Sequence, residues 1–307
     1  MINILVTGGA GNVGSALVDR LVLDGSYNVV VLDNLLTGSI SKLPKAADFT
    51  FVKGDVNIHD TVNELMHSMH FDYVFHYAAV VGVQRTLANP VMVLNDINGF
   101  RNILDMSRAT GVKRVFFSSS SEVYGEPVEF PQNEHTTPLN SRLPYAIVKN
   151  VGEAFLRSYH KEYGLDYTIL RFFNTYGPKQ SNDFVISRFI QQAMDGVDVT
   201  IYGDGRQSRT FCYIDDNIDV TMMCLSKGLV INDVMNVGSA EEVTILELAE
   251  RVIKITNSSS KIKFLPALKE GDMTRRKPDN SKMLSLLNRP LISLDEGIKR
   301  TFQRFKS

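Results

Sequence analysis

Apolar runs and amphipathic stretches alternate through the first half of the chain. The short, almost continuously apolar runs predict strands at Ile2–Thr7, Asn28–Leu32, Phe49–Val52, Tyr73–Tyr77, Arg114–Ser118 and Asp166–Arg171. The stretches between them have helical periodicity and predict helices at Gly14–Asp24, Val62–His70, Pro90–Thr110 and Pro144–Tyr163. Apolar strands that alternate with helices are typical of a doubly wound parallel sheet covered on both faces. The pattern therefore predicts an α/β fold.

The alternation ends after Pro178, and shorter mixed elements follow. They include a strand at Val199–Tyr202, a polar turn at Gly203–Ser208 and a helix at Thr244–Thr256. We therefore expect a sheet domain in residues 1–173, to which a segment near 209–235 returns, and a smaller C-terminal α/β lobe formed mostly by residues 174–307. No repeat or low-complexity linker separates the two parts, so we expect them to share an interface.

Composition and charge argue against several classes of protein. The 307 residues carry a net charge of −1, so no basic surface suggests nucleic acid or an anionic membrane as a partner. No apolar run approaches the roughly 20 residues of a membrane-spanning helix, and the N-terminus lacks the features of a signal peptide. Cys212 and Cys224 have no His or Cys at metal-ligand spacing, which favours buried, reduced thiols and no metal site. We expect a cytoplasmic protein.

A glycine-rich turn joins the first predicted strand to the first predicted helix in the segment ILVTGGAGNVGS. Gly8, Gly11 and Gly14 stand at GxxGxxG spacing, with Asn12 and Val13 between the last two. In such a turn the first glycine permits the tight bend and the second lets a pyrophosphate approach backbone N–H groups, while the third lets the helix pack against the strand. The helix N-terminus adds unpaired N–H groups and a partial positive charge. The turn predicts a Rossmann-type dinucleotide site.

The end of the next strand indicates which dinucleotide is bound. Asp33 closes the segment NVVVLD, where a carboxylate can accept hydrogen bonds from the adenosine ribose hydroxyls. Asn34 follows, with no Arg or Lys close by to receive a 2′-phosphate, which favours NAD over NADP. Asp55 and Val56, after the third strand, are expected beside the adenine. The alternatives are that Asp33 only caps a turn and that Asp55 is the N-cap of the following helix.

Two segments carry candidate catalytic groups. FFSSSSEVYG, residues 116–125, lies at a strand end, and PYAIVKN, residues 144–150, begins a predicted helix. Tyr145 and Lys149 are four residues apart in that helix, so their side chains share one face. A free phenol titrates near pH 10, and a lysine ammonium one turn away, together with the charge of a nicotinamide ring, can stabilise its anion and make it a usable base.

Together these segments resemble a known family. TGGAGNVG, LDN, the His-x-Ala-Ala at 76–79, SSSSEVYG, PYAIVK, RFFNTYGP and IYGDGRQSRTFCYIDD are similar, in order, to the extended short-chain dehydrogenase/reductase family, in its branch of nucleotide-sugar epimerases, dehydratases and decarboxylases. The resemblance covers essentially the whole chain and implies NAD-dependent oxidation of a nucleotide-diphosphate sugar at C4. By position, Tyr145 would take the hydroxyl proton, and Ser120 would bridge Tyr145 and the sugar oxygen. Lys149 would hold the nicotinamide ribose and lower the pKa of the tyrosine.

The resemblance also implies further contacts. These are Ala78 and Ala79 for the cofactor and Val83, Asn174 and Arg209 for the substrate. Asn174 would bind the diphosphate and Arg209 a phosphate oxygen, which the planar guanidinium suits. The alternative for Arg209 is a surface ion pair with Asp215 or Asp216. His76 is expected to be structural.

Glu122 bears on the reaction step after the oxidation. Dehydratases and decarboxylases of the family usually carry Glu at this position, where plain 4-epimerases usually carry a small or neutral residue. Ser121 before it resembles the decarboxylases and some dehydratases, and we include it among the catalytic candidates. TRRKPDNSK, residues 274–282, resembles the QRRKPD segment of UDP-glucuronate decarboxylases and implies an active-site role for Arg276.

Other features leave the net reaction open. Ala146-Ile147-Val148 lacks the acidic pair that the decarboxylases tend to have, and Ser120 replaces their more usual Thr. C4 epimerisation and release of the 4-keto sugar by a net dehydrogenase are alternatives. A non-catalytic NAD-binding sensor is an alternative of another class, although such proteins normally lose the Tyr or the Lys. We also expect a homodimer built from the helices near 90–110 and 144–163, and loops around 179–190 that read the nucleobase.

Overall fold

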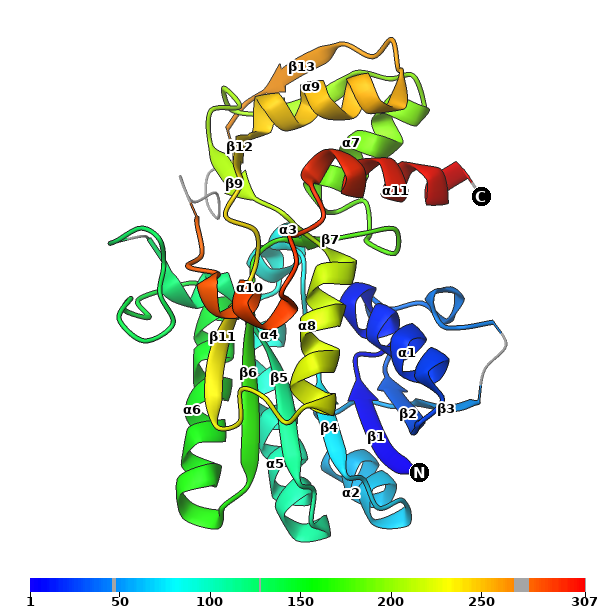
Figure 1. Ribbon diagram of the computed structural model, residues 1–307, viewed down its shortest axis with the longest axis vertical. Coiled ribbons are helices and arrows are strands. Elements are labelled where there is room, and N and C mark those ends of the chain that lie inside the picture. The colour runs from blue at the N-terminus through cyan, green and yellow to red at the C-terminus, as the bar shows by residue number, and fades with distance from the viewer. Residues whose placement is uncertain (46–47, 127, 268–275, 307) are drawn as a thin grey trace.

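The computed structural model describes residues 1–45, 48–126, 128–267 and 276–306, with only the backbone of Val83 and Gln84 (Figure 1). Seven parallel strands form its central sheet in the order β11-β6-β5-β4-β1-β2-β3. The strands are β1 (Ile2–Thr7), β2 (Tyr27–Asp33), β3 (Phe49–Lys53), β4 (Tyr73–His76), β5 (Arg114–Ser120), β6 (Asp166–Phe172) and β11 (Asp233–Val237). The chain winds outward from β1 to β3 and then crosses back to β4. The predicted doubly wound sheet is confirmed.

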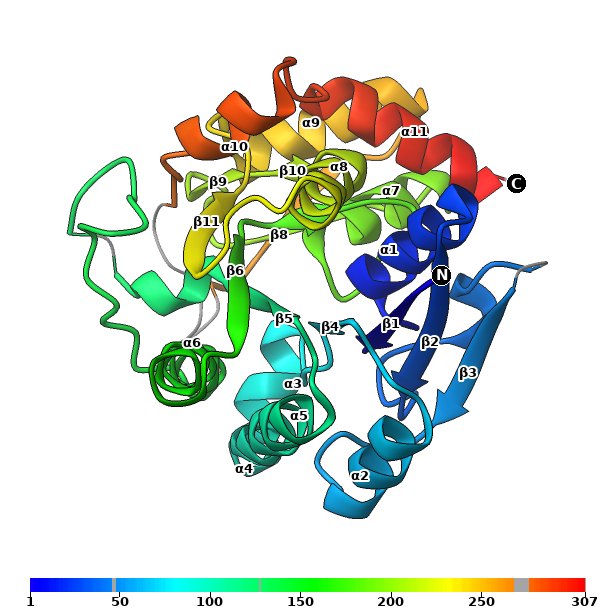
Figure 2. The same cartoon turned by 60° about the horizontal axis from the view of Figure 1, so that its bottom comes forward.

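Helices cover both faces of this sheet (Figure 2). One face carries α2 (His59–Ser68), α4 (Pro90–Leu94), α5 (Asp96–Thr110) and α6 (Pro144–Tyr163), and the other carries α1 (Asn12–Asp24) and α8 (Ile214–Ser226). Successive residues of a strand point to opposite faces, so Ile4 and Val6 enter one core and Leu5 enters the other. Burial on both sides explains why the strands are apolar nearly throughout.

The predicted elements differ from the observed ones in a few places. Helix α6 begins at Pro144 and ends at Tyr163 as predicted, whereas the predicted helix Pro90–Thr110 is interrupted at Asn95. There the N–H of Asn98 donates to the carbonyl of Asn95 at 3.0 Å, a three-residue spacing that tightens the turn. Helices α1 and α2 begin two and three residues before the predicted starts. Strand β11 and the short helix α3 (Val83–Ala88) were not predicted.

The rest of the chain forms short strand pairs with helices, gathered at one end of the sheet in Figure 1. The strands are β7 (Thr175–Tyr176), β8 (Val199–Tyr202), β9 (Ser208–Thr210), β10 (Cys212–Tyr213), β12 (Glu242–Thr244) and β13 (Ile262–Leu265). The helices are α7 (Val185–Met194), α9 (Ile245–Thr256), α10 (Ser281–Leu287) and α11 (Leu294–Lys306). Thr244 starts α9 through a capping box with Glu247. The division of the chain near residue 173 stays a prediction.

Cys212 and Cys224 are both buried free thiols. Within the ranges described above, no helix is both long and apolar enough to cross a membrane.

Candidate active site

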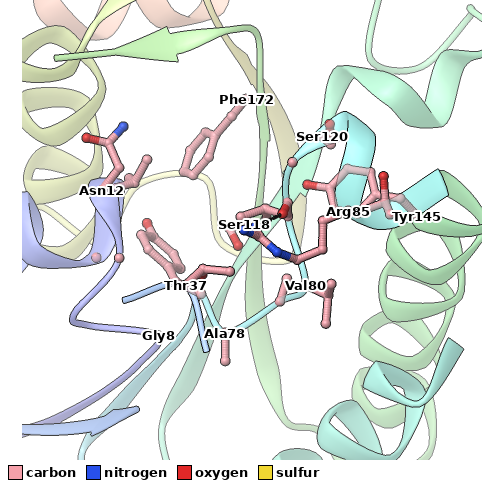
Figure 3. Close-up of a pocket in the computed structure, with 18 of the residues that line it drawn as sticks. Gly8, Asn12, Thr37, Ala78, Val80, Arg85, Ser118, Ser120, Tyr145 and Phe172 are labelled. Carbon is pink, nitrogen blue, oxygen red and sulfur yellow. Dashed lines mark hydrogen bonds between the residues drawn. The ribbon is translucent and has the colours of Figure 1, made fainter. Parts of the chain in front are cut away.

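A cavity of about 820 Å³ opens where the parallel strands of the sheet end. This is the place where doubly wound sheets bind their ligands. In Figure 3, Gly8 and Asn12 lie on one side of this cavity, and Ser120 and Tyr145 lie on the other. The predicted site residues that line it are Gly8, Gly11, Asn12, Val13, Gly14, Asp33, Asn34, Asp55, Val56, Ala78, Ala79, Ser120, Ser121, Glu122, Tyr145, Lys149, Asn174 and Arg276. The fold thus gathers residues from distant parts of the chain into one site.

The glycine turn between β1 and α1 has the shape that a dinucleotide phosphate requires. Gly8 has φ 68°, and a Cβ there would lie 2.6 Å from the backbone nitrogen of Ala78. A Cβ on Gly14 would lie 2.2 Å from the carbonyl oxygen of Gly8. A Cβ on Gly11 would lie 3.1 Å from that same oxygen. Gly11 is also the N-cap of α1 and provides no side-chain cap, which leaves N–H groups of the helix start available to an anion.

Asp33 and Asp55 flank the adenosine end of the cavity. Asp33 Oδ2 accepts a hydrogen bond from the backbone N–H of Ala10 at 2.9 Å, and Oδ1 accepts one from Leu35 at 2.8 Å. The carboxylate therefore also holds the glycine turn. Asp55 Oδ1 accepts from the N–H of Asn57 at 2.8 Å. Helix α2 has Ile58 as its N-cap, so the alternative of Asp55 as the cap of this helix is wrong.

Lys42 is a cavity residue that sequence reasoning missed. It lines the cavity from the short 3-10 helix Ile40–Lys42. Burial lowers the pKa of Lys42, and the nearby charge of Asp33 raises it. The expectation that no basic residue stands near Asp33 is therefore wrong. The polar loop that follows β2 gave no signal that it folds back over the cavity.

Lys149 lies almost fully buried on α6, one turn beyond Tyr145. Its Nζ is 4.9 Å from the ring centre of Phe117 and 5.7 Å from that of Tyr145. Burial lowers the pKa of Lys149 to about 8, and the charge of Asp96 raises it. Asp96 is a second cavity residue that the sequence did not predict, and its Oδ2 accepts a hydrogen bond from the N–H of Val80 at 2.8 Å.

The environment of Tyr145 bears on its expected role as a base. Burial, followed by the negative charge of Glu122, raises the pKa of Tyr145 above its usual value. A hydrogen bond with Ser120 and the charge of Arg276 lower the pKa, but by less than burial raises it. The protein groups by themselves therefore raise the pKa of Tyr145, and the nicotinamide charge, which is part of the prediction, is not among them.

An ion pair stands next to Tyr145. Arg276 Nη1 donates to Glu122 Oε1 at 2.6 Å, and the Arg276 side chain is only 6% exposed. Glu122 Oε2 is buried without a hydrogen-bond partner among the described residues. Ser120 Oγ accepts from the N–H of Glu122 at 3.2 Å and begins the 3-10 helix Ser121–Tyr124, which orients the carboxylate. The sequence placed both charged residues at the site but did not predict their contact.

The remaining substrate candidates have different outcomes. Asn174 lines the cavity with φ 40°, and its Nδ2 donates to the carbonyl of Thr210 at 2.9 Å. Arg209 is not part of the described lining, and its Nη1 donates to the carbonyl of Ser208 at 2.7 Å. The alternative partners of Arg209 are engaged elsewhere, since Asp215 pairs with Arg300 and Asp216 with Arg289. The side chain of Val83 lies outside the described residues.

Comparisons with known proteins agree with this geometry. The sequence model of the family described as "NAD dependent epimerase/dehydratase family" matches residues 4–238. UDP-glucuronic acid decarboxylase 1 of Danio rerio is 35% identical over 98% of this chain and 72% of its own length. The structure of UDP-glucose 4-epimerase from Thermotoga maritima, with UDP-glucose, has a TM-score of 0.93, 33% identity and 99% coverage of both chains. That of UDP-glucuronic acid 4-epimerase from Bacillus cereus, in complex with UDP-glucuronic acid and NAD, has a TM-score of 0.89, 32% identity and 99% coverage of both.

These matches span most or all of the chain, and they agree with the glycine turn and with the Tyr-Lys pair. The chain belongs to the NAD dependent epimerase/dehydratase family, in the nucleotide-sugar branch of the extended short-chain dehydrogenases, and is an NAD-dependent enzyme.

Proposed function

We propose that this enzyme oxidises C4 of a nucleotide-diphosphate hexuronate and then removes the carboxylate of the sugar as carbon dioxide. The observation that carries the proposal is the Glu122–Arg276 pair beside Tyr145. The Danio rerio relative, a UDP-glucuronic acid decarboxylase by name, supports the same activity.

The position of Arg276 favours a substrate whose C5 carries a carboxylate. A guanidinium binds a carboxylate with two parallel hydrogen bonds, and burial strengthens such a contact. In the protein by itself Glu122 supplies the negative charge, and a hexuronate carboxylate would compete for the same guanidinium. A dehydratase substrate presents a neutral C6 hydroxyl here, for which an arginine has little use.

The first step uses Tyr145 and Ser120, which lie beside the Glu122–Arg276 pair. Tyr145 takes the proton of the C4 hydroxyl, while Ser120 donates a hydrogen bond to the same sugar oxygen. Gly11, the start of α1 and Asp33 would hold NAD, with Lys149 near its nicotinamide ribose. When bound, NAD supplies the acceptor for the C4 hydride and the positive charge that the Tyr145 anion requires.

The second step depends on the chemistry of the oxidised sugar. A ketone at C4 makes the C5 carboxylate a β-keto acid, so the C5–C6 bond can break with its electron pair moving into the carbonyl. Tyr145, now protonated, and Ser120 stabilise the oxygen on which the negative charge collects. Glu122, released from Arg276 by the substrate, can take a proton from water and pass it to C5 after carbon dioxide leaves. Return of the hydride to C4, with return of the Tyr145 proton to the C4 oxygen, would complete a pentose product.

The test is to incubate the purified enzyme with UDP-glucuronate, UDP-glucose and dTDP-glucose and to measure product mass. We expect only the uronate to lose one carbon dioxide. Arg276→Lys should raise KM for the uronate by more than tenfold, because a lysine cannot make the paired contact. Arg251→Lys, which alters a half-exposed arginine paired with Glu241, is the matched control. Turnover of the other sugars with no carbon dioxide from any uronate would refute the proposal.

C4 epimerisation is the second candidate. It is favoured by the neutral segment Ala146-Ile147-Val148 and by the similarity to the Thermotoga maritima epimerase. The same experiment distinguishes it, because an epimerase gives a product of unchanged mass with inverted C4.

We also propose that the enzyme is a homodimer whose interface is formed by α5 and α6. These helices pack side by side, and apolar side chains remain exposed on and before them, with Ile147 39% exposed, Tyr163 45% and Val91 71%. Two such pairs would form a four-helix interface. Light scattering at micromolar concentration should give twice the mass of the chain, and a monomer would contradict this.

A cytoplasmic location is the third part of the proposal. It is supported by Cys212 and Cys224, which are both unpaired thiols, as is usual in reducing compartments. Fractionation of cells that produce the protein should recover it with cytosolic markers.

A further inference from the structure

The segment that carries Arg276 is held in place by a buried polar network that the mechanism does not use. Residues 277–279 lie against the chain at Gln132, whose N–H donates to the carbonyl of Lys277 at 2.8 Å. In return the N–H of Asp279 donates to the carbonyl of Gln132, also at 2.8 Å. Arg276 therefore reaches Glu122 from a segment that is fixed by backbone hydrogen bonds to a distant loop.

Asn236, at the end of β11, joins these two stretches. Its Nδ2 donates to the carbonyls of Gln132 at 2.8 Å and Asp279 at 3.2 Å, and its side chain is fully buried. Its Oδ1 accepts from the hydroxyl of Tyr124 at 2.7 Å. The side-chain amide of Asn236 can therefore form these hydrogen bonds in one orientation only, because a flipped amide would turn its oxygen toward two carbonyl oxygens.

Tyr124 connects this amide to the strand that bears the catalytic serines. Tyr124 is the last residue of the 3-10 helix that contains Glu122, and its hydroxyl accepts from Arg171 Nη1 at 2.8 Å. Arg171 is fixed in turn by a buried, two-bonded ion pair with Glu153, at 2.8 and 2.7 Å. Ser119 Oγ also donates to Glu153 at 2.7 Å. Both partners of the Glu122–Arg276 pair are therefore tied to one buried framework.

We propose that Tyr124 and Asn236 are positioning residues for the second step, because they hold the segment after Arg276 in register with Glu122. This inference rests on the proposed function, in which Arg276 binds the hexuronate carboxylate and Glu122 acts after C4 is oxidised. Neither residue lines the cavity within the described part of the chain, so both act through Arg276 and Glu122. Within the described residues, Tyr124 and Asn236 form no hydrogen bond with Tyr145, Lys149 or Ser120. Changes at Tyr124 and Asn236 also leave both groups of the Arg171–Glu153 pair in place, so oxidation should depend on the two residues much less than the second step does.

The variants Tyr124→Phe and Asn236→Asp test this inference. Tyr124→Phe removes one oxygen and keeps the ring, while Asn236→Asp replaces two donors with a carboxylate that faces two carbonyls. Tyr159→Phe is the matched control, since it removes a hydroxyl bonded to Asp105 at 2.6 Å outside the network. In single turnovers of the NAD-loaded enzyme with UDP-glucuronate, NADH absorbance reports oxidation and product mass reports loss of carbon dioxide.

We expect both network variants to oxidise the sugar at close to the wild-type rate. The fraction that stops as 4-keto sugar and NADH should rise about tenfold. This corresponds to a change of about 1.4 kcal/mol in the activation free energy of the second step relative to that of the first. The control should partition like the wild type. Equal losses in both steps, or wild-type partitioning in both variants, would overturn the inference while the proposed function stands.

Hydrogen exchange gives a readout that does not depend on carbon dioxide. The amide of Asp279 should exchange faster in Tyr124→Phe and Asn236→Asp than in the wild type or in Tyr159→Phe. Should the wild type release no carbon dioxide from any hexuronate, the proposed function fails, and the exchange data decide only whether Tyr124 and Asn236 hold the segment after Arg276. Unchanged exchange at Asp279 would then refute that role.

Discussion

The two ends of the cavity are built in different ways. The cofactor end is made from one continuous turn, Gly8 to Gly14, together with the end of the adjacent strand at Asp33. The sugar end is made from side chains that are far apart in sequence, such as Glu122 and Arg276, separated by 154 residues. One end depends mainly on backbone shape and the other on a network of buried charges.

The difference predicts how each end fails. At the cofactor end a new Cβ can block a backbone approach, so steric changes should dominate. At the sugar end a changed side chain leaves a partner charge or donor uncompensated, so effects should appear in one chemical step and not in the other.

Tyr145→Phe should have the largest effect on the sugar end. Without the hydroxyl, no group takes the C4 proton, and the rate of hydride transfer should fall by about 10²–10⁴-fold, as is typical for loss of a general base. Stopped-flow NADH absorbance measures the rate, and equilibrium titration measures NAD affinity. NAD affinity should stay near the wild-type value. A rate of hydride transfer close to that of the wild type would remove Tyr145 from its assigned role.

Glu122→Gln should affect only the step after oxidation. We expect hydride transfer to remain nearly intact and the 4-keto sugar to accumulate with NADH, with the later step slowed by about tenfold to a hundredfold. Mass spectrometry of quenched reactions identifies the sugar. Should Glu122→Gln block the first hydride transfer as completely as Tyr145→Phe does, Glu122 belongs to the oxidation step, and the separation of the two steps is wrong.

Gly14→Ala and Gly11→Ala separate folding from binding at the cofactor end. A Cβ on residue 14 would lie 2.2 Å from the carbonyl oxygen of Gly8, so the fold should lose about 3 kcal/mol of unfolding free energy. At residue 11 the closest approach is 3.1 Å, so the fold should tolerate the methyl group while NAD binding weakens. Urea unfolding and NAD titration give the two quantities. Equal loss of stability in both variants would show that Gly11 is structural too.

The sequence predicted the cofactor end of the cavity more fully than the sugar end. The glycine turn, Asp33 and the Tyr145–Lys149 spacing are local patterns, and each lies at the cavity as expected. The resemblance also located Glu122 and Arg276, because a motif transfers the place of a residue. It could not supply their 2.6 Å contact, the raised pKa of Tyr145 or the role of Asn236, because these depend on tertiary packing.

Lys42 and β11 were missed for the same physical reason. Lys42 reaches the cavity only because the polar loop after β2 turns back through the Ile40–Lys42 turn. Strand β11, DVMNV, is short and contains a buried Asn, so it lacks the continuous apolar run of the other strands. Its Asn236 is buried because it bonds to a network that no local pattern reveals.

Substitution of His76 should have the smallest effect of those predicted here, and the effect is on stability. His76 lies on β4, between the two ends of the cavity. Its Nδ1 is 2.9 Å from Thr7 Oγ1, and the Thr7 hydroxyl accepts from the N–H of Ala78 at 3.3 Å, which leaves the hydroxyl proton to donate to a neutral ring. Burial, followed by the charge of Lys149, lowers the pKa of His76 from 6.5 to about 3. Between these values the unfolded chain binds a proton that the folded chain does not. The stability that the neutral ring provides is therefore complete above pH 6.5 and is lost as the pH falls toward 3.

At pH 5 the loss should be about 2 kcal/mol relative to neutral pH, since each pH unit below 6.5 costs about 1.4 kcal/mol. Urea unfolding of the wild type and of His76→Gln at pH 7, 6 and 5 measures it. His76→Gln should be less stable at pH 7 because the ring fills a packed site, but its stability should fall less steeply with acid. Parallel pH slopes in the wild type and in His76→Gln would contradict this account, because they would show that protonation of His76 does not cause the loss of stability in acid.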